Sequence, residues 1–270
     1  MLNYKLIAVD LDGTLLDSNR NISTRTKELI HEYQSLGGIF TLATGRMEDS
    51  AKQYADDIGI SPLIIAYNGA KIVDLADNAV YHEAFLNPDF ARNAYQALRE
   101  IKKDVVIYYG GHPHVAEINP NIERYINRIK IDIRIIDNIH DIINENTKKL
   151  LVIDPLQEFD RIREILAPIF GDQLNCVSSD DEFLEILPPN VSKGDGLRFI
   201  AQYFNIDIGA TIAIGDHLND ISMIEAAGVG VAVENATEPV LRIADFITTD
   251  NNHEGVAHVL EKVIAGEILG

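Results

Sequence analysis

Two aspartates, Asp10 and Asp12, follow an apolar run in the segment KLIAVDLDGT near the start of the chain. An aspartate at the end of a strand is often no more than a turn or helix-capping residue. Two carboxylates brought to one place repel each other, however, and buried charges in proteins are normally paired or bound to a metal. The spacing therefore raises the question of which cation these carboxylates face.

Three other segments place polar residues at the end of a predicted strand or at the start of a predicted helix. They are FTLATGR, NVSKG and TIAIGDHLND, and the polar residues concerned are Thr44, Gly45, Lys193, Asp216, Asn219 and Asp220. Ligands of open parallel sheets bind beyond the carboxyl ends of the strands. If these strands share one sheet, we expect their polar ends to meet in one crevice.

Each of these segments also has a purely structural explanation. Thr44 and Gly45 could form a simple turn, and Asn219 could cap the helix that follows it. Lys193 alone could be an exposed surface lysine, as most lysines are. The combination favours a site, because four aspartates at one sheet edge create a negative cluster that needs a cation. Oxygen ligands without a His or Cys cluster favour a hard ion such as Mg²⁺.

The two ends of the chain alternate between strand and helix patterns. Continuous apolar, β-branched runs at 4–10, 39–44 and 62–67 are separated by helical patterns at 23–36 and 48–57. This order predicts a parallel sheet that is covered by helices on both faces. The same rhythm returns late in the chain, so we expect both ends to form one doubly wound, Rossmann-like α/β core.

The middle of the chain has a different organisation. Predicted strands follow one another between turn residues, for example at 104–111 and 148–154. Such neighbouring strands are typical of a separate α+β module inserted into the first domain. We therefore expect a discontinuous core formed by residues 1–83 and 188–270, and an inserted domain formed by residues 84–187.

Charge and composition narrow the classes of partner. The chain has 270 residues, with 42 acidic and 23 basic side chains and a formal net charge of −19. This charge repels nucleic acid and anionic membrane surfaces over long range. The sequence shows no leader pattern and no apolar stretch near the roughly 20 residues of a membrane span, and Cys176 is its one cysteine. We expect a cytoplasmic protein without an intramolecular disulfide.

Four segments in a fixed order resemble the motifs of the haloacid dehalogenase (HAD) superfamily: DLDGT (10–14), TGR (44–46), SKG (192–194) and GDHLND (215–220). The nearest resemblance is to the Cof-type phosphatases of subfamily IIB, whose large cap domain lies between the second and third motifs, as the insert does here. Any one motif is weak evidence, whereas the ordered set is specific. The resemblance implies an α/β core with an α+β cap and an enzyme that hydrolyses phosphoric monoesters.

The resemblance assigns the covalent chemistry to two aspartates and a lysine. Asp10 matches the nucleophile that forms an aspartyl-phosphate, and Asp12 matches the general acid and base. Lys193 matches the lysine that neutralises phosphate and nucleophile, while Thr44 and the Gly45 amide match the phosphate-holding second motif. These roles agree with general chemistry, because phosphoryl transfer depends mainly on positioning and on cationic stabilisation.

The same resemblance implies Mg²⁺ as the cofactor. Asp10, the backbone carbonyl of Asp12 and the Asp216 carboxylate match its ligands. Asp220 matches the residue that orients the metal or its water, and Asn219 is expected to contact the phosphate.

Substrate choice is expected to lie in the inserted cap. In YYGGHPH, the side chains of Tyr108, His112 and His114 surround a Gly-Gly turn and could hydrogen-bond or stack on a sugar, although a plain hairpin explains the same residues. Arg46, beside the second motif, could contact the substrate or form an ion pair with cap carboxylates. The YNG segment at 67–69 is expected to form a turn.

We therefore expect a Mg²⁺-dependent phosphatase that acts on a small phosphorylated metabolite, with sugar phosphates as the favoured class. Two alternatives stay open: a phosphomutase or other phosphotransferase on the same scaffold, and a non-catalytic regulator that binds a phosphorylated ligand. Asp12 favours hydrolysis, because relatives that preserve the aspartyl-phosphate, such as ion pumps, resemble this motif with Thr at that position. The sequence makes no prediction of the oligomeric state.

Overall fold

The computed structural model describes residues 2–59, 63–138 and 141–268, and the chain divides into two compact units. Residues 1–83 and 192–270 form the first, called the core unit, and the second, called the inserted unit, contains the residues between them. The chain leaves the core unit after Glu83 and returns at Ser192, whereas the sequence placed the return at residue 188.

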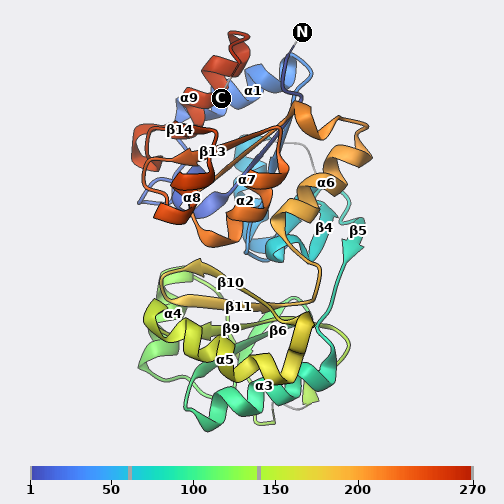
Figure 1. Cartoon of the computed structure of the whole chain (residues 1–270), viewed down its shortest axis with the longest axis vertical. Coiled ribbons are helices and arrows are strands. Elements are labelled where there is room, and N and C mark those ends of the chain that lie inside the picture. The colour runs from blue at the N-terminus through green and yellow to red at the C-terminus, as the bar shows by residue number, and fades with distance from the viewer. Residues whose placement is uncertain (1, 60–62, 139–140, 269–270) are drawn as a thin grey trace. The chain divides into compact units, whose positions relative to one another are not determined.

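A parallel sheet forms the centre of the core unit, with the strand order β14-β13-β12-β1-β2 (Figure 1). All neighbouring strands in it are parallel, which confirms the predicted Rossmann-like α/β fold. A parallel bridge between Ala43 and Ile65 places β3 beside β2, and β3 then joins the antiparallel sheet β3-β4-β5. Pro62, in the predicted third strand, lies outside the described residues. The strands are β1 (Leu6–Val9), β2 (Ile39–Leu42), β3 (Leu63–Ala66), β4 (Lys71–Asp74), β5 (Val80–Glu83), β12 (Thr211–Gly215), β13 (Val229–Val233) and β14 (Phe246–Thr248).

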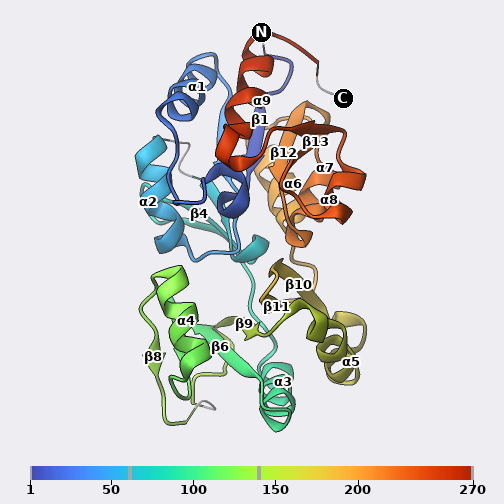
Figure 2. The ribbon, with the colours of Figure 1, turned by 90° about the vertical axis from the view of Figure 1, so that its left-hand side faces the viewer.

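Helices cover both faces of the parallel sheet (Figure 2). On one face, Leu197 of α6 and Met223 of α7 belong to the same buried cluster as Leu6 and Ala8 of β1. On the other face, α1 packs against α9 and β2. The helices are α1 (Thr24–Ser35), α2 (Glu48–Ile58), α6 (Lys193–Tyr203), α7 (Ile221–Ala226), α8 (Glu238–Ile243) and α9 (Gly255–Ile264), and the short helical turns are η1 (Leu11–Leu15), η2 (Tyr67–Gly69), η6 (Ile208–Ala210), η7 (Leu218–Asp220) and η8 (Asn251–His253).

The inserted unit contains a six-stranded sheet in the order β10-β11-β9-β6-β7-β8, antiparallel except for the pair β7 and β8. Helices α3 and α5 lie side by side on one face of it (Figure 1), where Leu98 and Phe159 pack in one cluster with Ile107. Its strands are β6 (Asp104–Tyr109), β7 (His112–Val115), β8 (Arg134–Ile135), β9 (Thr147–Ile153), β10 (Asn175–Asp180) and β11 (Phe183–Leu187), and its helices and short turns are α3 (Pro88–Glu100), α4 (Pro120–Ile129), α5 (Phe159–Phe170), η4 (Leu156–Glu158) and η5 (Gly171–Gln173).

Helices α3 and α4 are absent from the sequence prediction, although both begin with the same signal. Asn87 and Asn119 cap them by accepting backbone N–H bonds, and each is followed by a proline in the first turn, where a missing N–H costs nothing. Neither of them, nor any other helix among the described residues, is long and apolar enough to cross a membrane.

Candidate active site

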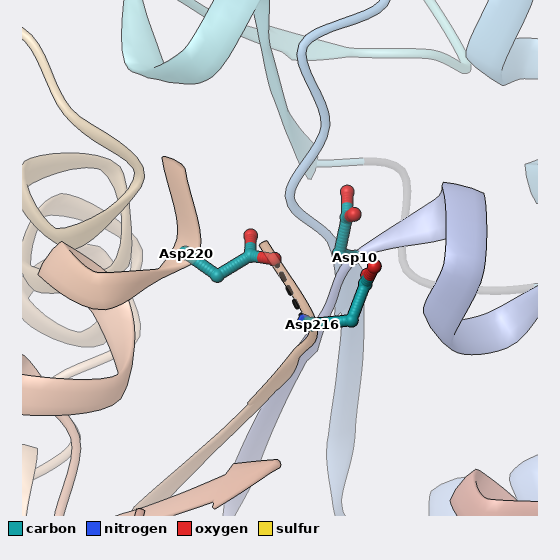
Figure 3. A group of neighbouring side chains, drawn as sticks. All are labelled: Asp10, Asp216 and Asp220. Carbon is teal, nitrogen blue, oxygen red and sulfur yellow. Dashed lines mark hydrogen bonds between the residues drawn. The ribbon is translucent and has the colours of Figure 1, made fainter. Parts of the chain in front are cut away.

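The ends of β1 and β12 bring two predicted site residues together. Val9 pairs with Ile214 in parallel register, and the next residue, Asp10, donates its N–H to Ile214 O at 3.0 Å. Asp10 and Asp216 therefore directly follow neighbouring parallel strands, at the carboxyl ends of both. With Asp220 from η7 they form a group in which one carboxylate oxygen from each residue lies within 4.8 Å of the other two (Figure 3).

Lys193 supplies the positive charge of this group. Its ammonium donates to Asp10 Oδ1 at 2.7 Å and to Asp220 Oδ1 at 2.6 Å, and the side chain is fully buried. The lysine reaches this place because it is the first residue of α6, which Ser192 caps by accepting the N–H of Asp195. An ammonium has three N–H donors, so these two bonds leave one for a bound anion.

Asp220 holds the loop after β12 in place. Its Oδ1 accepts from Lys193, and its Oδ2 accepts the backbone N–H groups of Asp216 and His217 at 2.9 and 3.0 Å. Figure 3 shows the bond to Asp216 as a dashed line. Both oxygens of Asp220 are thus engaged inside the protein, which suits a residue that orients its neighbours.

Gly13 and Thr14 fix Asp216 against the loop that follows Asp10. The Thr14 hydroxyl donates to Asp216 Oδ1 at 2.6 Å. Gly13 has a φ of 78°, and a Cβ there would lie 2.5 Å from Asp216 Oδ2, so both backbone and space require glycine. Thr14 thus engages Oδ1 of Asp216, and Lys193 engages Oδ1 of Asp10. Among the described residues, the Oδ2 atom of each is left for a ligand.

The electrostatics of the group show a surplus of negative charge. Burial, with added repulsion from Asp220, raises the pKa of Asp10 to about 7 although Lys193 acts to lower it. Burial, followed by the charges of Asp220 and Asp10, also raises the pKa of Asp216 well above its usual value. Burial lowers the pKa of Lys193, but the two carboxylates outweigh it and raise that pKa overall.

The donor set of the three aspartates fits a metal ion. One lysine faces three buried or partly buried carboxylates, and their oxygens are hard ligands of the kind that divalent cations such as Mg²⁺ prefer. A cation in contact with Asp10 and Asp216 would favour their charged forms and so offset the raised pKa values.

The second motif follows β2. Thr44 is buried, its N–H donates to Ile65 O at 2.8 Å, and its hydroxyl accepts the N–H of Arg46 at 3.1 Å. The hydroxyl hydrogen of Thr44 is therefore directed away from that bond, and Gly45, the next residue, is partly exposed.

Arg46 forms a two-pronged ion pair with Asp12, a contact that sequence reasoning missed. Its Nε and Nη2 donate to the two carboxylate oxygens of Asp12, both at 2.6 Å. The Arg46 side chain is 8% exposed against 49% for Asp12, and its guanidinium lies 5.2 Å from the ring centre of Tyr54. Burial alone would lower the pKa of Arg46, and the bonds to Asp12 raise it instead. Contact of Arg46 with substrate or cap stays a prediction.

Asn219 is also buried beside the group, one residue before Asp220. Its Nδ2 donates to Asn68 Oδ1 at 3.0 Å. Its Oδ1 is buried and, within the part of the chain that the structure describes, has no hydrogen-bond partner. Asn68 belongs to the YNG segment, for which the sequence predicted only a turn.

A family model described as haloacid dehalogenase-like hydrolase matches residues 7–260. The chain belongs to this family. The resemblance drawn from the four motifs is thereby confirmed, and so is the expected enzyme class, because several relatives of this HAD-like hydrolase are named as phosphatases or putative phosphatases.

Three similar proteins illustrate the relationship. The putative phosphatase YxeH of Bacillus subtilis (strain 168) is 32% identical over 270 residues, which cover 97% of this chain and 98% of that protein. A haloacid dehalogenase-like hydrolase from Bacteroides thetaiotaomicron has a crystal structure with a TM-score of 0.85 and 30% identity, covering 96% of this chain and 99% of that one. The HAD subclass IIB sugar phosphatase BT4131 shares the fold, with a TM-score of 0.85 at 19% identity over 95% and 98% of the two chains.

The candidate substrate residues of this HAD-like hydrolase lie on the hairpin formed by β6 and β7 in the inserted unit. Tyr108 is buried, with its hydroxyl 2.5 Å from that of Tyr125. His112 Nε2 lies 2.7 Å from an Arg134 nitrogen, and the buried His114 has its Nδ1 3.0 Å from the carbonyl of His112. Burial lowers the pKa of His114. These partners give the hairpin residues a structural role, and their contact with substrate stays a prediction.

Proposed function

We propose that this hydrolase is a Mg²⁺-dependent phosphatase of small phosphorylated metabolites that works through an aspartyl-phosphate on Asp10. The proposal is carried by one observation: Asp10 lies buried between an ammonium at 2.7 Å and a second carboxylate from the neighbouring strand. Sugar phosphates are the favoured substrate class, which the shared fold of the subclass IIB sugar phosphatase supports.

In the first step, Asp10 Oδ2 would attack phosphorus as the bond from phosphorus to the leaving oxygen breaks. Charge on the phosphoryl oxygens would be balanced by the third N–H of Lys193 and by the Thr44 hydroxyl, the Gly45 N–H and the Asn219 amide. The leaving alkoxide would take a proton from Asp12.

In the second step, Asp12 would accept a proton from water while the water oxygen attacks phosphorus, and the bond to Asp10 would break to release phosphate. Arg46 engages both oxygens of Asp12, so at least one of these bonds must open before that oxygen exchanges a proton. Mg²⁺ would be held by Asp10, Asp216 and the backbone carbonyl of Asp12, and when bound it supplies positive charge to the phosphoryl oxygens.

The test is phosphate release from p-nitrophenyl phosphate and from a panel of sugar phosphates, with Mg²⁺ and with chelator. Asp10→Asn removes the nucleophile, and we expect its turnover to fall by at least about a thousandfold, with circular dichroism unchanged. Equal rates for wild type and Asp10→Asn would reject the covalent mechanism. A second sugar phosphate as product, without inorganic phosphate, would identify a phosphotransferase instead.

A further inference from the structure

The YNG segment at residues 67–69, between β3 and β4, has an unusual backbone. Tyr67, Asn68 and Gly69 have φ values of 49°, 54° and 100°. Positive φ is uncommon outside glycine, and asparagine is among the few residues that adopt it readily. Successive residues of this kind persist only where their surroundings fix them, and such strain is concentrated at functional sites.

The surroundings of this turn are two of the motif segments. The N–H of Tyr67 donates to Arg46 O at 3.0 Å, and the N–H of Asn68 donates to Thr44 O at 2.9 Å. A Cβ on Gly69 would lie 2.1 Å from the backbone oxygen of Ser192, so only glycine allows the turn to approach the residue before Lys193.

The side chain of Asn68 reaches a third motif. It is 1% exposed, and its Oδ1 accepts the 3.0 Å bond from Asn219 Nδ2. Because the oxygen of Asn68 is the acceptor in this bond, the Asn219 amide turns its nitrogen toward Asn68 and its oxygen away from it. It also leaves Asn219 one free N–H and a buried oxygen that has no partner among the residues described. A buried polar group of this kind calls for an explanation, and a bound ligand is one.

We infer that Asn68 is a positioning residue of the phosphate site. Its side chain orients the amide of Asn219, and its left-handed backbone holds the carbonyl of Thr44. The inference rests on the proposed function, because the phosphate-holding roles of Asn219 and Thr44 belong to it.

A double-mutant cycle between Asn68 and Asn219 tests this coupling. Asn68→Gly keeps the left-handed backbone and removes only the side chain. Asn78→Gly is the matched control, because Asn78 has a φ of 61° and is exposed in the connection between β4 and β5 of the same unit. With p-nitrophenyl phosphate we expect Asn68→Gly to lower kcat/KM by about 10-fold to 100-fold, as losses of supporting contacts commonly do, and the control to match wild type.

The double variant decides whether Asn68 acts through Asn219. We expect its kcat/KM to lie within about threefold of Asn219→Ala alone, because residues that share one interaction are not additive. An Asn68→Gly enzyme as active as wild type would overturn the inference. So would effects of the two single variants that multiply.

A second measurement does not depend on turnover. Hydrogen exchange of the Asn219 side-chain amide, followed by NMR, is expected to be at least about tenfold faster in Asn68→Gly than in wild type, because exchange requires the hydrogen bond to open. Unchanged exchange would contradict the inference. Faster exchange in a protein without phosphatase activity would leave the contact standing and reject the proposed function.

Discussion

Two buried lysines, one in each unit, show how differently the same ion pair can be used. Lys149 in the inserted unit donates to Glu185 at 2.6 Å, and each side chain is 4% exposed. The second oxygen of Glu185 accepts from the Ser179 hydroxyl at 2.7 Å. In this contact one ammonium meets one carboxylate, as in a structural ion pair.

Lys193 in the core unit faces a surplus of carboxylates instead. It bonds both Asp10 and Asp220, and Asp216 lies within the same group. Burial raises the pKa of Asp10 to about 7, the charge of Asp220 adds to this rise, and Lys193 acts to lower it. A buried ion pair is therefore weak evidence of function. A buried lysine that faces more carboxylates than it can neutralise, at the carboxyl ends of parallel strands, indicates a site for a cation.

Replacing each of the two lysines by methionine is expected to lower kcat strongly for Lys193 and hardly at all for Lys149. Lys193→Met removes the ammonium that would face the phosphate in the proposed mechanism, and we expect kcat for p-nitrophenyl phosphate to fall by about 10²–10³-fold, the size of losing one charge-stabilising donor. Lys149→Met leaves the buried Glu185 without the ammonium of Lys149. We therefore expect the thermal unfolding temperature of this variant to fall, while its kcat stays near that of wild type. Equal kcat losses in folded samples of both variants would erase the distinction.

A smaller effect is expected from the ion pair between Arg46 and Asp12. Arg46→Lys keeps the charge but cannot form the two-pronged contact, so Asp12 is less well fixed. We expect kcat to fall by about 10-fold to 100-fold, within the range of proton-transfer and supporting contacts, with a small change in KM. A rise in KM with unchanged kcat would show instead that Arg46 contacts the substrate.

The pH dependence of stability is expected to reflect the titration of Asp10. The folded-state pKa of Asp10, about 7, lies above the ordinary value of 3.8, so between these pH values the folded state binds more protons than the unfolded state. In chelator, this group makes the free energy of unfolding decrease as pH rises from 4 to 7, by at most about 1.4 kcal/mol per pH unit.

Urea unfolding at several pH values measures this slope. Asp10→Asn removes the titrating group, so we expect a flatter profile than in wild type. Because a divalent cation favours the charged carboxylates, added Mg²⁺ should stabilise the wild type more at pH 7.5 than at pH 5. A stability that rises with pH to the same extent in both proteins would contradict the assigned pKa shift.

The sequence predicted those parts of the molecule that depend on local patterns. Fully buried strands such as β1 and β12 appear as continuous apolar runs, and their order predicts the parallel core. Because parallel strands have their carboxyl ends at the same end of the sheet, the polar residues that follow them were expected to lie close together. The structure does place Asp10, Asp216 and Lys193 together.

Contacts made by packing could not be read from the sequence. Arg46 meets Asp12 across 34 residues, and Asn68 meets Asn219 across 151. No local pattern specifies such a pair. For the contact of Asn68, the sequence held one indication: the Asn-Gly pair of the YNG segment is typical of a backbone with positive φ. Helices α3 and α4 do begin with Asn-Pro, but this signal is short and lies among strand patterns that dominate the inserted unit.

A crystal structure of the protein with Mg²⁺ and orthovanadate, a mimic of the phosphoryl group in transfer, would show whether the aspartate group binds both the metal and the phosphoryl group. We predict a metal ion between Asp10 and Asp216, with vanadium bonded to Asp10 Oδ2 and a vanadate oxygen within hydrogen-bond distance of Lys193 Nζ. Vanadate and metal bound elsewhere, with the bond between Asp10 and Lys193 unchanged and no ligand at the three aspartates, would reject the proposed phosphatase site.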